Sequence, residues 1–434
     1  MIIQNLYWIY AEQFVRFTVG VLIGAWMARY FGPTVFGELI YVMSITTVVA
    51  FASNFGMKNI LLKDIVNKEK SQSTIISSSM ALKVVFALAI IFPTYIFIFI
   101  TYDHSAGTKV TLLSILIISV LLNPTDLFTL LYQVDMKNYI VSIAKMLTLI
   151  SFSIVKVALI MNKGSVVSLA IIIVFEHAVM FFTIIILNKI YYPNIHYFSV
   201  DYEYCKSLLS KSFPLLISSL SIVIYTKIDI FMLELLMEPK YVGIYGAGIR
   251  VSESAALLLP LFVSTVFPVV LKLYSSDIQQ FGIILQKVLN FAVAFSFFIS
   301  TIIFIASDEI IDFLYGPDYH EASLILGIHV ISIVFINMGV VTSVWLIANG
   351  LQKIAMQRSL VALCANIALN FIMIPFFGMA GAAFATLLTH FFANFIWDFV
   401  NTNFRSLARM KLKSLNPVNI FNIKGHVAIL NISS

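Results

Sequence analysis

Long apolar runs separated by short polar segments make up most of the chain. Runs bounded by charged residues or by Gly/Pro turns give twelve candidate membrane spans. They lie near residues 7–30, 36–56, 79–100, 110–132, 139–161 and 165–187 in the first half, and near 213–236, 243–269, 283–306, 322–347, 358–376 and 379–401 in the second. About 20 apolar residues are enough for a helix to cross the hydrocarbon core of a bilayer. We therefore expect an all-α polytopic membrane protein with twelve transmembrane helices.

The composition agrees with this prediction. Hydrophobic residues make up 60% of the 434 residues and charged residues 11%, and the mean hydropathy is +0.98. Soluble proteins have about 45–50% apolar and about 25% charged residues. The net charge of +6 comes from residues in short loops, without a basic stripe or zinc-finger spacing, so we expect no nucleic-acid partner. The two cysteines, Cys205 and Cys364, predict neither a disulfide framework nor a metal site.

The distribution of Lys and Arg predicts the orientation in the membrane. With the N-terminus inside, the inner loops and the tail carry 16 basic residues and the outer loops carry 4. Inner loops of membrane proteins are enriched in basic residues. Both termini are therefore predicted to be cytoplasmic. The longest stretches between spans have about 20–30 residues, which leaves no room for a folded domain outside the membrane.

The two halves of the chain resemble each other weakly. Pro33 and Gly37 follow the first span, and Pro239 and Gly243 follow the seventh at an offset of 206 residues. Six spans per half give both halves the same sense in the membrane, so we expect a pseudo-two-fold axis along the membrane normal. In transporters such repeats place the substrate path between the halves. The expected organisation is a six-helix bundle (1–188), a cytoplasmic connector (189–212), a second six-helix bundle (213–401) and a cytoplasmic tail (402–434).

Seven basic residues lie inside the predicted spans: Arg16, Lys83, Lys145, Lys156, Lys227, Arg250 and Lys287. Lys83, Lys156 and Lys287 are near span ends, where their long side chains are expected to reach the membrane surface. The other four lie deeper, where a charge costs at least about 2.5–3.5 kcal/mol. We therefore interpret Arg16, Lys145, Lys227 and Arg250 as substrate-binding cations that line a wet cavity.

Ion pairing is the alternative explanation for these cations. Glu12 and Arg16 are four residues apart, and Arg250 and Glu253 are three apart, so each pair can close on its own helix. Lys227 and Asp229 are two apart and point to different sides of a helix, so they need partners elsewhere. On the fifth predicted span, Lys145 and Lys156 share one stripe with two serines, Ser142 and Ser153.

Acidic residues inside the spans are candidates for ion coupling. Asp126, Glu176 and Asp229 are each able to carry a coupling proton or sodium ion, and the sequence does not choose among them. The chain has no Gly-rich phosphate loop, no H-E-x-x-H and no nucleophile elbow. We therefore expect a transporter rather than an enzyme, with no cofactor beyond a coupling proton or sodium ion.

Several short motifs are spread along the chain. They are Asn5–Leu6–Tyr7–Trp8, Ala28–Arg29–Tyr30–Phe31–Gly32–Pro33 with Phe36–Gly37, Lys227–Ile228–Asp229, Val242–Gly243–Ile244–Tyr245–Gly246–Ala247, Leu314–Tyr315–Gly316, and Asn370–Phe371–Ile372–Met373–Ile374–Pro375 with Gly378–Met379–Ala380–Gly381–Ala382–Ala383. Together they resemble the motifs of polysaccharide flippases, the O-antigen (Wzx-type) members of the multidrug/oligosaccharidyl-lipid/polysaccharide exporter superfamily. The resemblance covers essentially the whole chain.

This resemblance implies translocation of an undecaprenyl-pyrophosphate-linked oligosaccharide across the bacterial inner membrane by alternating access, through a cationic central cavity. The implied partners are this lipid-linked oligosaccharide, the phospholipid membrane and the polysaccharide polymerase machinery. Arg16 and Arg250 would bind pyrophosphate as forks, and Lys145 and Lys227 as point charges. Residue roles are carried over from the family only at the matched Asp229 and its neighbour Lys227, because sequences in this family diverge with the sugars that they carry; the other candidates rest on their burial in the spans.

Two other functions remain open from the sequence. An ion-coupled drug exporter of the same superfamily would favour an acidic cavity, whereas the deep charges here are mostly basic. A membrane-embedded polysaccharide polymerase or ligase would carry a large outer loop with catalytic groups. The outer loops predicted here have about 15 residues or fewer.

Overall fold

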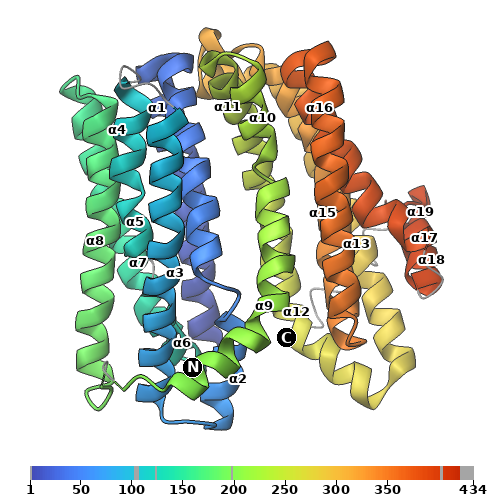
Figure 1. Cartoon of the computed structure of the whole chain (residues 1–434). Helices are drawn as coiled ribbons and strands as arrows, with labels where there is room; N and C mark the ends of the chain where they lie inside the picture. The colour runs from blue at the N-terminus through green and yellow to red at the C-terminus, as the bar shows by residue number, and fades with distance from the viewer. Residues whose placement is uncertain (1, 102–106, 123–124, 197–198, 401–403, 421–434) are drawn as a thin grey trace. The chain divides into compact units, whose positions relative to one another are not determined.

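The computed structural model describes residues 2–101, 107–122, 125–196, 199–400 and 404–420, and every regular element within these ranges is a helix (Figure 1). The chain divides into two compact units, Met1–Val223 and Ile224–Ser434. The predicted connector, 189–212, lies within the first unit. Of the predicted tail, residues 402–403 and 421–434 lie outside the described residues.

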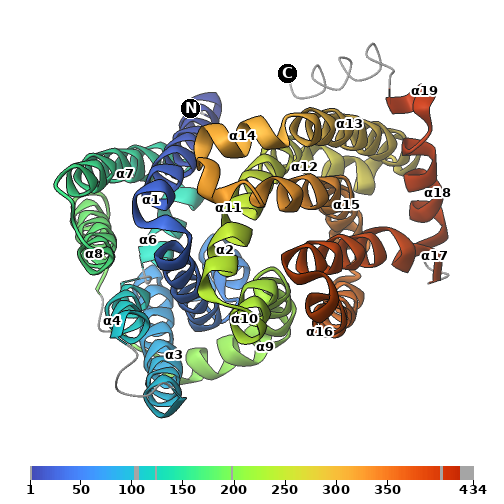
Figure 2. The ribbon, with the colours of Figure 1, turned by 90° about the horizontal axis from the view of Figure 1, so that it is seen from above.

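The first unit is a bundle in which α1 packs against α7, α3 and α4, and α8 packs against α7 and α4 (Figure 2). Its helices are α1 (Ile2–Ser53), α2 (Lys58–Asn67), α3 (Gln72–Thr101), α4 (Gly107–Leu116), α5 (Ile118–Leu121), α6 (Thr125–Val134), α7 (Asn138–Met161), α8 (Val166–Tyr191) and α9 (Tyr202–Tyr225).

Helix α1 is a hairpin of two helical segments. Gly32 has φ 73° and ψ 168°, a conformation that favours glycine and breaks the helix. Before the break, Asn5 accepts a hydrogen bond from the Tyr139 backbone N–H at the start of α7, and Tyr30 donates to the Gly164 carbonyl just past its end. After the break, the chain returns to Met57, which is buried in a cluster around the α6–α7 turn. The predicted spans 7–30 and 36–56 correspond to these two segments.

The segment before α9 is tied to α3 and its preceding loop. Asp201 accepts from Lys70 Nζ at 3.0 Å, and its backbone N–H donates to Ser78 Oγ at 2.9 Å. Asp201 also caps α9 by accepting from the Tyr204 backbone N–H at 3.1 Å. The Tyr204 hydroxyl donates to Asp64 of α2 at 2.7 Å. The described residues of the predicted connector therefore pack as part of the first unit.

The second unit is built around α15, which packs against α11, α13 and α16. Its elements are α10 (Ile228–Leu236), α11 (Pro239–Ala256), α12 (Leu258–Ser276), α13 (Ile278–Ile305), α14 (Ser307–Leu314), the 3₁₀ turn η1 (Pro317–Tyr319), α15 (Ala322–Ala348), α16 (Gln352–Phe391), the π-helical turn η2 (Phe392–Ile396), α17 (Trp397–Val400), α18 (Arg405–Ser414) and α19 (Pro417–Ile420).

Helix α16 is also a hairpin. Gly378 has φ 56° and ψ −135°, which breaks the helix. The side chain of Asn366, before the break, donates to Thr389 Oγ1 after it at 3.1 Å. Closer to the bend, a Cβ on Gly381 would lie 2.3 Å from the Met373 carbonyl oxygen, so the two segments approach at a distance that only glycine allows.

The predicted single span 213–236 is interrupted in the structure. Helix α9 ends at Tyr225, and α10 begins at Ile228 after a turn at Thr226 and Lys227. The apolar pattern continues through this turn because both helices are apolar, so hydropathy alone does not reveal the break. Lys227 and Asp229 therefore lie at the start of a helix, where backbone and side-chain directions differ from those inside a continuous helix.

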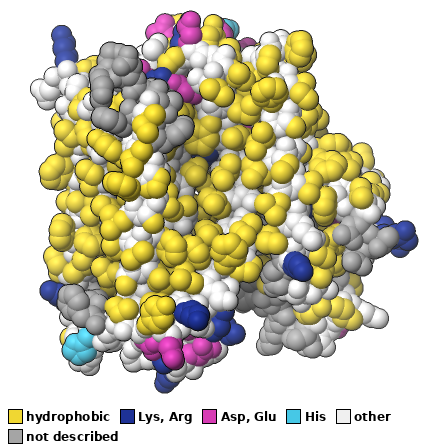
Figure 3. All heavy atoms as spheres, viewed as in Figure 1, with side chains coloured by type: hydrophobic (Ala, Val, Ile, Leu, Met, Phe, Trp, Pro, Cys, Tyr) yellow, Lys and Arg dark blue, Asp and Glu magenta, His cyan; other side chains and the backbone are white. Residues whose placement is uncertain are grey.

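Among the described residues, ten helices are long and apolar enough to cross a membrane. Two of them, Tyr7–Ser53 and Lys353–Val400, contain the hairpins and have 47 and 48 residues. Large hydrophobic side chains such as Phe92, Ile154 and Phe376 are exposed on the helix sides. In the space-filling view, hydrophobic side chains cover the flanks, and most charged ones gather at the two ends (Figure 3). This is the surface of a multi-pass membrane protein.

The hydrogen bonds of Asp201 predict that the stability of the fold decreases in acid. Two hydrogen bonds lower the pKa of Asp201 below its ordinary value: the one from the Tyr204 backbone N–H has the larger effect, and the one from Lys70 the smaller. The ionised carboxylate therefore stabilises the fold above its unfolded pKa of about 4, and this stabilisation is lost as the pH falls through the lower folded pKa. Asp201→Asn should lower the melting temperature at pH 7. The difference in melting temperature between this variant and the wild type should shrink toward pH 2.5. A difference that stays constant over this range contradicts the stabilising role of the Asp201 carboxylate.

Close packing of α11 on α15 predicts an effect of a single methyl group. A Cβ on Gly248 would lie 2.8 Å from the Ala322 carbonyl oxygen and 3.1 Å from Ile325 Cβ. Gly248→Ala should therefore destabilise the protein by about 1–3 kcal/mol. Gly282→Ala in α13 is the matched control, because nothing lies within 4 Å of its added Cβ. Thermal unfolding in detergent should show a lower melting temperature for the first variant and an equal or higher one for the second.

Candidate functional site

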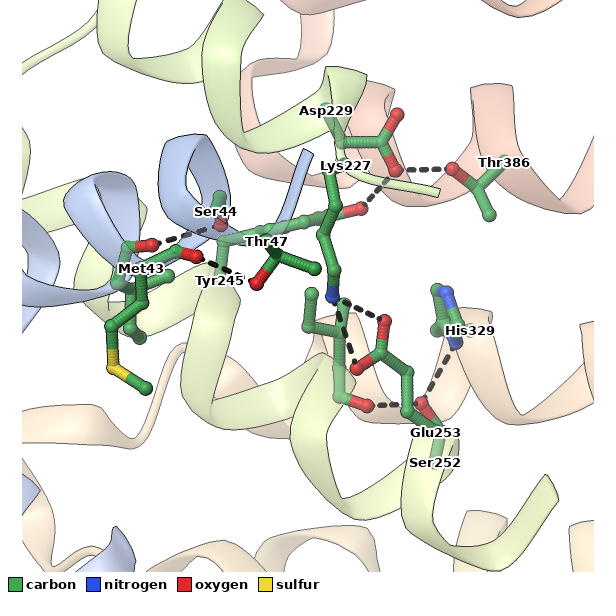
Figure 4. A network of polar contacts seen from close by, with 12 residues as sticks. Met43, Ser44, Thr47, Lys227, Asp229, Tyr245, Ser252, Glu253, His329 and Thr386 are labelled. Carbon is green, nitrogen blue, oxygen red and sulfur yellow. Dashed lines mark hydrogen bonds and ion pairs between the residues drawn. The ribbon is translucent and has the colours of Figure 1, made fainter. Parts of the chain in front are cut away.

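The carboxylate of Asp229 is the centre of a buried polar cluster in the second unit (Figure 4). Oδ2 accepts hydrogen bonds from the Tyr245 hydroxyl at 2.7 Å and from the Thr386 hydroxyl, and Oδ1 accepts from Asn370 Nδ2 at 2.8 Å. The donors come from α11 and from both segments of the α16 hairpin. The amide oxygen of Asn370 is buried without a hydrogen-bond partner. The cluster therefore combines a buried carboxylate with an unused acceptor, a composition suited to holding a small cation or a proton.

Lys227 binds a carboxylate on the next helix. Its Nζ lies 3.1 Å from Glu253 Oε1 and 3.4 Å from Oε2. Next to this pair, Ser252 Oγ lies 2.7 Å from Nδ1 of the buried His329 on α15 (Figure 4). The sequence correctly placed the partner of Lys227 outside its own helix. Glu253 binds Lys227 rather than Arg250, so the alternative of an Arg250–Glu253 pair is not realised among the described residues.

Arg250 has no carboxylate or hydrogen-bond partner among the residues that the structure describes. It is half-buried on α11, in a helix apolar enough to span the membrane. Its guanidinium acts electrostatically on Tyr315, which follows α14. Burial raises the pKa of Tyr315 to about 12, and the Arg250 guanidinium opposes that rise. An unpaired guanidinium at such a position is available to bind an anion.

The cations of the first unit differ in their partners. Arg16 forms the predicted ion pair with Glu12 at 2.6 Å, and 53% of its side chain is exposed. Glu12 also accepts from Ser142 Oγ of α7 at 3.4 Å. Lys145, three residues further along α7, is half-buried and has no ion pair or hydrogen bond within the described ranges. Glu12 thus connects Arg16 on α1 to Ser142 on α7.

Two lysines interpreted as reaching the membrane surface have other positions. Lys156 binds Glu176 of α8 at 2.5 Å, with 13% of its side chain exposed. Lys83 is 5% exposed and lines a cavity. Lys287 is exposed, as expected. The interpretation was wrong for Lys83 and Lys156, because helix packing in the first unit covers both side chains.

The three acidic candidates thus have different environments. Glu176 is paired with Lys156, Asp126 is an exposed residue that lines the same cavity as Lys83, and Asp229 is buried among neutral donors. Of these three carboxylates, only that of Asp229 is both buried and hydrogen-bonded to several neutral donors. In the described part of the chain, no cluster of three or more His, Cys, Asp or Glu side chains is placed to hold a metal ion.

The sequence did not single out the ion pair between Asp398 and Lys411. The two side chains are 1% and 0% exposed, and Nζ lies 2.5 Å from Asp398 Oδ2 and 2.5 Å from the Asn394 carbonyl in the π-helical turn. Burial lowers the pKa of Lys411 to about 8, against the attraction of Asp398. This ion pair holds α18 against α17, at the end of the membrane helices. Asp398 near the end of an apolar run was the available signal.

Comparison with known proteins defines the family. The model of a family described as polysaccharide biosynthesis protein matches residues 2–274, more than half of the chain. The chain belongs to this family. A second model, MatE, matches residues 214–372. The resemblance to polysaccharide flippases of the multidrug/oligosaccharidyl-lipid/polysaccharide exporter superfamily is therefore confirmed.

Two curated relatives of this polysaccharide biosynthesis protein match about half of it. The probable low-salt glycan biosynthesis flippase Agl15 of Haloferax volcanii is 26% identical over 216 residues, which are 47% of this chain and 45% of the relative. The capsular polysaccharide biosynthesis protein CapF of Staphylococcus aureus is 24% identical over 208 residues, 48% of this chain and 52% of the relative. The chain thus matches about half the length of each relative.

Solved structures share the fold over almost the whole length. The lipid II flippase MurJ in an inward closed conformation has a TM-score of 0.75 at 18% identity, covering 99% of this chain and 98% of that one. An inward-facing multidrug resistance MATE family transporter has a TM-score of 0.72 at 12% identity, covering 93% and 96%. At these identities the match shows the fold alone.

The Asp229 cluster predicts a large loss of stability when its carboxylate is removed. Asp229→Ala leaves three buried donors without an acceptor and should lower the free energy of unfolding by about 3–5 kcal/mol. Asp318→Ala is the control, because Asp318 is exposed on η1 and its loss should cost less than about 1 kcal/mol. Thermal unfolding of the purified variants measures both. Equal melting temperatures for the two variants contradict the cluster.

Proposed function

We propose that this family member is a flippase that moves a lipid-linked oligosaccharide across the membrane by alternating access. The observation that carries the proposal is Arg250, a guanidinium held in a membrane helix without a carboxylate partner among the described residues. A charge in that position is costly and is retained where it serves a substrate or ion pathway. Family membership and the names of the curated relatives support the same function.

The chemistry of the substrate class fits the unpaired cations. A diphosphate linker carries about two negative charges, and a guanidinium binds such oxygens by charge-assisted bidentate hydrogen bonds. Lys145 of the first unit and Arg250 of the second unit are each proposed as an anion contact, because Arg16 and Lys227 are already held by Glu12 and Glu253. We further propose undecaprenyl pyrophosphate as the carrier, the bacterial inner membrane as the location, and the polysaccharide polymerase machinery as the system that receives the product.

The proposed topology has twelve crossings and cytoplasmic termini. Counting the hairpins at Gly32 and Gly378 as two crossings each raises the ten candidate spans to twelve. This agrees with the basic-residue bias of the loops. The pseudo-two-fold relation of the halves stays a prediction.

Asp229 is the proposed residue for ion coupling. The buried carboxylate and the unpartnered Asn370 oxygen would hold a proton or a sodium ion. The bound ion would neutralise the charge of the carboxylate during the transport cycle. Asp126 and Glu176 fit this role less well, because the first is exposed and the second is bound to Lys156.

Drug export is the alternative within the superfamily, favoured by the MatE match over residues 214–372. The unpaired cations Arg250 and Lys145 oppose it, because cationic drugs would be repelled. Resistance assays in an efflux-deficient strain distinguish the two functions. Protection against cationic drugs, together with normal surface polysaccharide in a deletion strain, would favour drug export.

Variants of Arg250 test the proposed function in cells. Arg250→Ala should reduce surface polysaccharide by about tenfold or more while the protein stays in the membrane, since one charge-assisted anion contact contributes roughly 1.5–3 kcal/mol. Lipid-linked repeat units should accumulate on the cytoplasmic leaflet. Lys240→Ala, on the same helix and exposed, should have no effect. Normal export in Arg250→Ala contradicts the proposal.

Lys227 allows binding and structural roles to be separated. If Lys227 only neutralises Glu253, then Lys227→Ala combined with Glu253→Gln should restore the export that Lys227→Ala loses. If Lys227 binds the anionic linker, the double variant should stay as defective as the single one. Surface polysaccharide, normalised to the amount of protein in the membrane, distinguishes the two results.

A further inference from the structure

A cavity of about 460 Å³ lies within the first unit, and its described lining contains none of Arg16, Lys145, Lys227 and Arg250. Its walls come from the end of α1, the start of α2, and helices α3, α6 and α9. The volume falls within the range of about 300–1,000 Å³ typical of small-molecule sites. Lys58 and Asp126, which are exposed, also line the cavity, so the cavity is open to the exterior at the end where these two residues lie. The basic-residue bias predicts that this end faces the cytoplasm.

Lys83 gives the cavity a buried positive charge. The residue is 5% exposed, and in the described part of the chain its ammonium group has neither an ion pair nor a hydrogen bond. Asp126, which lines the same cavity, interacts with Lys83 electrostatically but does not form an ion pair with it. Buried ammonium groups are normally bonded to a carboxylate or to backbone carbonyls. Lys83 is therefore available to a ligand.

The rest of the lining defines which ligand fits. Lys58 adds a second cation, so the two lysines outweigh Asp126 by one positive charge. The side-chain oxygen of Asn54 is buried and has no hydrogen-bond partner, which provides an acceptor for a hydroxyl group. Apart from Ser219, the remaining wall is apolar and includes Phe51 and Leu130. An anion attached to an apolar chain complements both parts of this lining.

We propose that this cavity binds the phosphate end of an isoprenyl-type lipid phosphate, with Lys83 as the main anion contact and Lys58 as the contact at the entrance. The inference rests on the proposed flippase function, in which such a lipid is the carrier. The site would capture the headgroup at the membrane surface before transport. Asp126 limits the affinity by repelling the phosphate, which would allow the headgroup to leave again.

Binding to the purified full-length protein in nanodiscs tests this proposal. The probes are farnesyl diphosphate, inorganic pyrophosphate and farnesol, measured by isothermal titration calorimetry. Farnesyl diphosphate should bind, and farnesol should bind at least about tenfold more weakly. Lys83→Gln should weaken binding of farnesyl diphosphate about tenfold or more, Lys58→Gln should weaken it less, and Asp126→Asn should tighten it a few-fold. Lys63→Gln is the matched control, because Lys63 is exposed on α2 and does not line the cavity.

The outcomes separate the sources of the anion. Tighter binding of farnesyl diphosphate than of pyrophosphate supports a lipid headgroup site. Equal binding of the two overturns the lipid assignment and leaves a site for free phosphate. Farnesyl diphosphate affinity that is unchanged in Lys83→Gln, or no detectable binding, overturns the site itself. Lys83→Arg and the melting temperature of each variant exclude misfolding as the cause of a loss.

A transport assay on the same preparations separates this inference from the proposed function. If the wild type moves lipid-linked oligosaccharide but Lys83→Gln binds farnesyl diphosphate normally, only the cavity assignment is overturned. If Lys83→Gln loses binding as expected but the wild type transports no such lipid, the anion site stands and the flippase function is overturned.

Discussion

The cost of placing a charge among apolar helices is the constraint on which this structure depends. A lysine or arginine in a membrane span must bind a carboxylate, donate hydrogen bonds to neutral acceptors, or serve a ligand. Lys156 and Lys227 satisfy the first condition through Glu176 and Glu253. Arg250, Lys145 and Lys83 have no such partner among the described residues, and these three form the basis of the functional account. The same constraint acts on Asp229, whose carboxylate is satisfied by three neutral donors.

Glycine and short breaks position these charged groups. The bends at Gly32 and Gly378 fold α1 and α16 into hairpins, and the second hairpin brings Asn370 and Thr386 to the same carboxylate. The turn between α9 and α10 places Lys227 and Asp229 at a helix start, where they reach partners on different helices. The polar cluster is therefore a consequence of irregular backbone inside otherwise apolar helices, which is tolerated in a membrane only where protein surrounds it.

Much of the fold was predictable from the sequence, because apolar runs and Gly/Pro turns are local signals. The paired spans around Gly32 and Gly378 were placed correctly, and so was the local pair Glu12–Arg16. Partners far apart in the chain were not predictable. Asn370 is 141 residues from Asp229, and no periodicity in one sequence relates them. For the same reason Lys83 was interpreted as a side chain at the membrane surface, since the cavity that it lines is completed by residues of α6 and α9, far along the chain.

The central claim is that unpaired cations are retained in the spans because the substrate carries an anionic linker. Purified protein in lipid vesicles tests it most directly, by measuring the transbilayer movement of two lipids with the same sugar and chain, one joined by a diphosphate and one by an uncharged linker. The account predicts that the diphosphate-linked lipid moves at least about tenfold faster, which corresponds to roughly 1.4 kcal/mol in the barrier. Equal rates for the two lipids would contradict it.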